Sequence, residues 1–133
     1  MSAENMDFLE NLVNTLDSQG YYAKVVSPVL ASGNSIAVMT MPSNDYDHYF
    51  DGSYRQGFAF QVLTKHEHQL TAYHALLSIT NFLKKVPDIA SNNGSYQFEE
   101  MKISTSPNGL GKDDKHHLFA AQFSAALFIE NKE

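Results

Sequence analysis

Histidines are the side chains of this sequence best suited to chemistry, because they bind metals and transfer protons near neutral pH. His66-Glu67-His68 has the composition of a metal site, yet it lies where we expect a helix to begin. On a helix, two ligands of one metal are spaced three or four residues apart, whereas His66 and His68 are two apart. The two imidazole rings could share a face only if this segment were a strand. His116-His117 opens an expected strand and projects to opposite faces. We therefore expect no metal site at these histidines.

Other reactive patterns are equally weak. His48 lies near Asp45, Asp47 and Asp51, but this segment lacks the Glu and Gly placement of an EF-hand calcium loop. The sequence has no nucleophile elbow and no phosphate-binding glycine loop followed by a helix. Its paired acids, Glu99-Glu100 and Asp113-Asp114, point apart on a strand. We expect a protein that is not an enzyme and that has no catalytic residues, cofactor or metal.

The amino-acid composition excludes several further classes of protein. The 133 residues suit one domain, and a net charge of −6 argues against a dedicated binder of nucleic acid or anionic membranes. The absence of cysteine excludes a disulfide scaffold, a thiol nucleophile and a Cys-ligated metal site. The N-terminus has no targeting pattern, and no apolar run is long enough for a membrane span. We expect one soluble domain over residues 1–133, made in the cytoplasm.

Periodicity predicts the elements that position these residues. Helical spacing predicts a first helix over 3–18, and a capping box at Thr64 with Glu67 predicts a second helix from there to Val86, ended by Pro87. Strands are expected over 21–26, 35–41, 57–63, 96–105 and 115–129, with a turn-rich loop over 107–114 and a long hairpin joining the last two. The prediction is an α+β fold of order α-β-β-β-α-β-β: two helices packed on a mainly antiparallel sheet of about five strands.

Two apolar features remain without an assigned partner. The expected loop over 42–56 is rich in aromatic residues: Tyr46, Tyr49, Phe50 and Tyr54. Such a loop either folds back over its own core or contacts another protein. The second helix has a narrow apolar row, Leu70, Tyr73 and Leu77, nearly opposite its core stripe. This row either lies between two layers or meets a partner.

The sequence resembles a known family along most of its length, from about Met39 to Glu130. Gly57–His66 and Gln69–Tyr73 resemble the strand-to-helix segment of small minor capsid proteins of long-tailed bacteriophages and prophages. Tyr49–Gly52, Asn93–Phe98, Thr105–Asn108 and the long last strand add to this likeness. These are scaffold and turn signatures and include no catalytic residue.

The resemblance implies a tail terminator: a virion protein that forms a ring, usually of six subunits, at the head-proximal end of the tail tube. Such a ring ends tube polymerisation and joins the tail to the head connector, after assembly in the host cytoplasm. Its partners are then itself, the tube protein and the connector, while DNA only passes through an acidic lumen. The alternatives are another neck or tail-completion protein and an unrelated α+β binding module.

A closed ring needs two different contact patches on each subunit. The aromatic loop (Tyr46, Tyr49, Phe50, Tyr54) and the helical row (Leu70, Tyr73, Leu77) are the candidates for these two patches.

Overall fold

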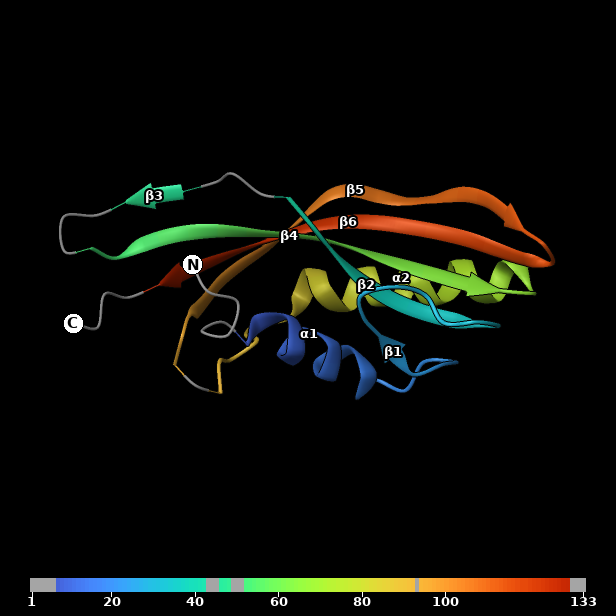
Figure 1. Ribbon diagram of the computed structural model, residues 1–133, viewed down its shortest axis with the longest axis horizontal. Coiled ribbons are helices and arrows are strands. Elements are labelled where there is room, and N and C mark those ends of the chain that lie inside the picture. The colour runs from blue at the N-terminus through green and yellow to red at the C-terminus, as the bar shows by residue number, and fades with distance from the viewer. Residues whose placement is uncertain (1–6, 43–45, 49–51, 93, 130–133) are drawn as a thin grey trace.

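The computed structural model of the protein describes residues 7–42, 46–48, 52–92 and 94–129, with the backbone alone described for 46–48. Figure 1 shows the arrangement of its helices and strands. The helices are α1 (Phe8–Asp17) and α2 (Gln69–Lys85). The strands are β1 (Val25–Val26), β2 (Ser35–Met41), β3 (Tyr46–His48), β4 (Tyr54–His66), β5 (Gln97–Asp113) and β6 (His116–Ile129).

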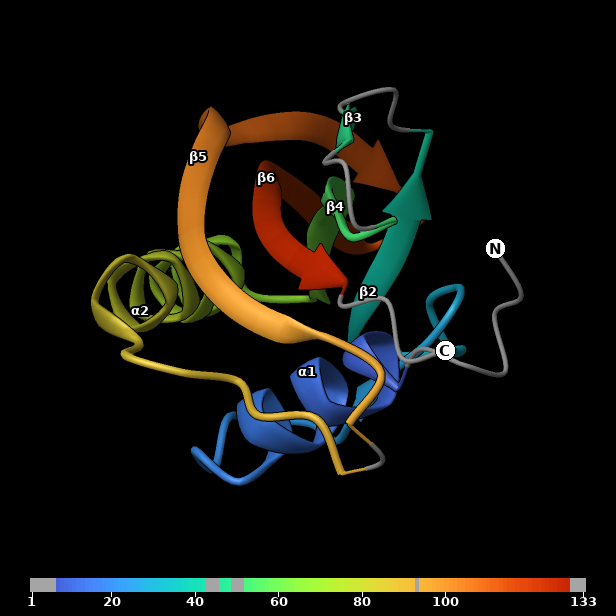
Figure 2. The same cartoon turned by 90° about the vertical axis from the view of Figure 1, so that its left-hand side faces the viewer.

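One mixed, mainly antiparallel sheet carries the fold. Its strands lie in the order β1-β2-β4-β6-β5, and the short β3 pairs beside the start of β4. β1 is parallel to β2, and the other pairs are antiparallel. The expected α+β class and element order are confirmed, with β3 as a short addition. The sheet twists strongly when viewed along its length (Figure 2).

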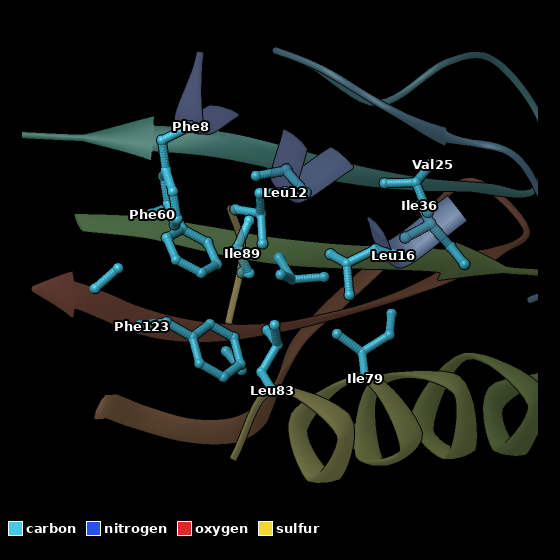
Figure 3. Close-up of a cluster of buried hydrophobic side chains, with 14 of the residues drawn as sticks. Phe8, Leu12, Leu16, Val25, Ile36, Phe60, Ile79, Leu83, Ile89 and Phe123 are labelled. Atoms are coloured by element: carbon cyan, nitrogen blue, oxygen red, sulfur yellow. The ribbon is translucent and has the colours of Figure 1, made fainter. Parts of the chain in front are cut away.

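The core lies between the two helices and one face of the sheet (Figure 3). Phe60 and Phe123 are directly opposite each other on β4 and β6, and their rings stack 5.3 Å apart. The core side chains from the helices are Phe8, Leu12, Leu16, Leu76, Ile79 and Leu83, all with no exposed surface. Removal of this apolar surface from water is the main force that holds the layers together.

The expected start of the second helix at Thr64 is wrong. Thr64 lies inside β4, between Ile36 of β2 and Phe119 of β6, and its hydroxyl donates to the carbonyl of Ala72 at 3.0 Å. Pairing with two neighbouring strands extends β4 to His66, and α2 begins only at Gln69. The predicted end of this helix at Val86 is confirmed, since α2 ends at Lys85 with Val86 as its C-cap.

Two expected loops contain strand. The 42–56 segment contains β3 and the first residues of β4, paired in register from Tyr46 with Gln56 to His48 with Tyr54. The 107–114 segment continues β5 as far as Asp113. β5 tolerates its glycines and Pro107 because it is an edge strand. Its pairing with β6 shifts register at several points, and these irregularities accommodate residues that regular pairing would exclude.

The other element boundaries differ less from expectation. β2 and β6 match their predicted spans closely, and the antiparallel pairing of β5 with β6 confirms the expected hairpin. The strand expected over 21–26 is reduced to Val25–Val26, which pairs only with Ile36 and Ala37. The first helix ends at Asp17, and its expected start at residue 3 lies outside the described residues. Neither described helix has the length and apolar character needed to cross a membrane.

Candidate assembly surfaces

α2 presents two apolar sides, as its sequence predicts. The side that faces the sheet carries Ala72, Leu76, Ile79 and Leu83, which are fully buried. This stripe fixes the rotation of the helix about its axis. The same rotation turns residues 70, 73 and 77 away from the centre of the core, because they are offset from the stripe around the helix.

We call Leu70, Tyr73 and Leu77 the α2 row. Leu70 is 65% exposed and Tyr73 is 36% exposed, whereas Leu77 is half-buried. The Tyr73 ring rests against Phe119 of β6, with ring centroids 5.4 Å apart. This contact holds the aromatic side chain in place while part of it remains accessible to a partner.

The exposed side of α2 lacks the charges that a solvated helix normally carries. No Asp, Glu, Lys or Arg occurs between Glu67 and Lys84. The central part of a protein interface is typically depleted of charged residues and enriched in aromatic and aliphatic ones. Leu70 and Tyr73 are therefore exposed apolar residues on a side of α2 that also carries the uncharged polar residues His74, Ser78 and Asn81, and the α2 row stays a predicted contact surface.

The aromatic segment is only partly described. Tyr54 lies in β4 opposite Ile129 of β6 and is half-buried. Tyr49 and Phe50 lie outside the described residues, and for Tyr46 only the backbone in β3 is described. Residues 46, 49, 50 and 54 thus stay predicted contact residues, but two of them belong to paired strands rather than to a loop.

The structure does not bring the aromatic segment and the α2 row together. β3 and the start of β4 lie at one end of the long axis, whereas α2 begins near the opposite end, where β4 ends, and runs back along the sheet (Figure 1). The two surfaces are therefore separate.

A further uncharged surface was missed by our reading of the sequence. We call it the β2 flank: the connection 27–34 and the following β2. It lies across the molecule from α2 in the end-on view (Figure 2). Val29 is 60% exposed, and Met39 and Met41 are half-buried. The signal that could have revealed it is the absence of any charged residue between Lys24 and Asp45.

The histidines lie at the end of the sheet where β4 leads into α2. His66 pairs with His117 across β4 and β6, and its ring lies 5.4 Å from that of His68. Its Nδ1 accepts a hydrogen bond from the His68 backbone N–H at 2.9 Å, so this nitrogen is unprotonated. Burial, together with the charges of His68 and His116, lowers the pKa of His66 despite the opposing effect of Glu67. Among the described residues, no three His, Asp or Glu side chains are grouped for a metal.

An open groove of about 420 Å³ lies along the segment that joins α2 to β5. The Tyr96 hydroxyl in its lining already donates to the Ile89 carbonyl at 2.6 Å. Ser91 and Asn92 in this segment bind the Asp7 carboxylate, at 2.9 and 2.7 Å. These polar groups hold the connecting segment on α1 and do not converge on an empty space.

Comparison with known proteins identifies a similar fold in a virus-like particle. No family model matches the sequence, and no curated protein is significantly similar to it. A chain in the solved structure "Virion of native gene transfer agent (GTA) particle" has the same fold, with a TM-score of 0.51. The similarity covers 91% of each chain at 14% sequence identity. At this identity the likeness establishes a shared fold over nearly the whole domain.

Proposed function

We propose that this protein is a structural component of a phage-like virion, in which it closes a ring at the head-proximal end of the tail tube. The observation that carries this proposal is the exposed, charge-free α2 row. An apolar surface that the folded subunit leaves uncovered is typical of a protein that assembles. The ring ends tube growth and presents a surface to the head connector.

Two independent lines support a virion role. The sequence resembles minor capsid and tail terminator proteins, and the fold matches that of a chain in a gene transfer agent virion. Fold similarity alone does not imply function, so the argument also needs a site. The α2 row provides one, because ring closure requires an adhesive surface on every subunit.

The ring needs contacts of more than one kind. Subunits must contact their neighbours, and the ring must contact the tube on one side and the connector on the other. The aromatic segment at the β3 end is separate from the α2 row and is a second candidate contact surface. Both proposed contacts are non-covalent, and we propose that the protein has no catalytic role.

The proposal predicts that a charge in the α2 row prevents assembly. Leu70→Asp places a carboxylate where a neighbouring copy would bury it, and an unpaired buried charge is strongly unfavourable. We expect wild-type protein to form a species of several subunits as its concentration rises, and the variant to remain monomeric. Sedimentation velocity and negative-stain images measure the two outcomes.

Ser104→Asp is the matched control, because it adds the same charge at an exposed position of β5. It should assemble as wild type does, and all three proteins should melt at similar temperatures because both sites are exposed. Wild-type protein that stays monomeric up to its solubility limit would contradict the ring.

A further inference from the structure

We propose that the α2 row of one subunit packs on the β2 flank of the next copy of this chain. This inference rests on the proposed ring and names the surface that receives the row. A heterologous contact needs two different surfaces that match each other in chemistry and position. The α2 row and the β2 flank meet both conditions.

The connection 27–34 of the flank and the start of the α2 row lie at the same end of the molecule. The connection 27–34 is bound to the end of β4, because Lys65 Nζ donates to the Ala31 carbonyl at 2.8 Å. The Glu67 backbone N–H also donates to Asn34 Oδ1 at 3.0 Å. α2 begins two residues after Glu67, so the start of the α2 row lies at the same level along the long axis (Figure 1).

The two surfaces also lie on opposite sides. Viewed along the long axis, α2 is on one side of the molecule and β2 with its preceding connection is on the other (Figure 2). Copies arranged side by side around an axis parallel to this direction therefore present the α2 row of one to the β2 flank of the next. Each copy uses both surfaces once, as a closed ring requires.

The chemistry of the two surfaces is matched. The exposed part of the α2 row is aliphatic and aromatic, and the flank supplies exposed Val29 together with half-buried Met39 and Met41 further along β2. Neither surface has a charged residue of its own, and the Lys65 ammonium at the edge of the flank already donates to the Ala31 carbonyl. Methionine side chains also adapt well to a neighbouring surface and contact aromatic rings favourably.

Charges that flank the two surfaces also favour a second copy of this chain as the partner. The only charged residues of α2 are Lys84 and Lys85 at its C-terminal end, and both are exposed. The charged residues of α1 are acidic, Glu10 and Asp17. α1 lies below β2 in the end-on view (Figure 2). The packing therefore brings the lysines of one copy towards the acidic helix of the next, which favours a second copy over an unrelated protein.

Cysteine cross-linking tests this contact directly, because the chain has no cysteine of its own. Val29→Cys and Leu70→Cys variants are prepared separately, mixed at a concentration at which wild-type protein assembles, and treated with a short bismaleimide. We expect a covalent dimer in the mixture and its loss when either variant is treated alone. Mixing two single variants excludes cross-links within one chain.

Ser104→Cys mixed with Leu70→Cys is the control pair, and it should give no dimer. A dimer from Leu70→Cys alone would indicate that the row packs on itself and would overturn the proposal. Assembly without a Val29–Leu70 dimer would also overturn it, while the proposed ring would stand. If wild-type protein fails to assemble at all, the proposed function is wrong and this contact falls with it.

Discussion

Asn11 and His66 show how single polar residues hold the elements around the candidate surfaces. Asn11 is buried on α1, and its amide donates to the Ala90 carbonyl at 3.0 Å and accepts from Asn92 at 2.7 Å. His66 accepts the His68 N–H at the turn into α2, and its ring contacts Tyr22 edge-on at 4.7 Å. Asn11 is a buried polar group whose hydrogen bonds are satisfied, whereas His66 is half-buried and its hydrogen bond fixes the turn into α2.

His66 predicts a loss of stability below neutral pH. Its pKa in the folded protein is lower than the ordinary value of 6.5, so the unfolded chain binds the proton more readily. The stability that neutral His66 contributes is complete above the unfolded pKa and decreases as the pH falls through 6.5 towards the folded pKa. Protonation also removes the acceptor of the His68 N–H.

We expect His66→Gln to reduce the difference in free energy of unfolding between about pH 7.5 and about pH 5.5, on either side of the usual histidine pKa. Urea unfolding at the two pH values measures this difference. His74→Gln changes an exposed histidine on α2 and serves as the control. An unchanged pH dependence in His66→Gln would show that other groups cause it.

The β5–β6 hairpin is the element that most extends the sheet beyond expectation. β5 deviates from regular pairing at several points, including between Gly109 and Gly111, and it runs past Pro107 without ending. Such irregularities at an edge strand also discourage pairing with a foreign strand. The edge is therefore poorly suited to assembly, which leaves the helical row and the β2 flank as better candidates.

The two glycines of this bulge should respond differently to alanine. Gly111 has φ +111°, a conformation that a side chain strains, whereas a methyl group on Gly109 would meet the Phe119 ring at an ordinary 3.6 Å. We expect Gly111→Ala to lower the free energy of unfolding by about 1–3 kcal/mol. Gly109→Ala should change it little. Thermal and urea unfolding of both variants measure the contrast, and equal effects would argue against a strained bulge.

At the scale of the whole molecule, charge is distributed unevenly. The chain carries a net charge of −6, yet α2 is charged only at its basic C-terminal end and the β2 flank is uncharged. A protein that only needed solubility would distribute its charges more evenly. The uneven pattern leaves two uncharged surfaces on opposite sides, with opposite charges near their margins.

Reversal of the lysine charges should weaken assembly in a salt-dependent way. Lys84→Glu with Lys85→Glu places acidic groups near the acidic α1 of the next copy, so assembly at low salt should require a higher protein concentration. The defect should shrink as salt rises, because the screening length falls from about 10 Å at 0.1 M to about 3 Å at 1 M.

Lys102→Glu with Lys112→Glu is the control, since it changes the net charge equally at exposed positions of β5. Sedimentation velocity over a salt series measures both variants. Equal assembly defects in the two variants would indicate an effect of net charge alone. They would contradict a specific attraction between the α2 lysines of one copy and the acidic α1 of the next.

Sequence patterns alone were enough to predict the fold class, the order of the main elements and much of the core. The alternation of Phe119, Ala121, Phe123 and Leu127 predicted β6, and helical spacing predicted both sides of α2, because these patterns report local burial directly. Tertiary structure decided where the strands ended: Thr64 reads as a helix cap, but pairing with β2 and β6 outweighs that local preference. Contacts between distant residues also place residues 27–34 and the start of α2 at one end of the molecule and on opposite sides, because sheet order and twist depend on such contacts.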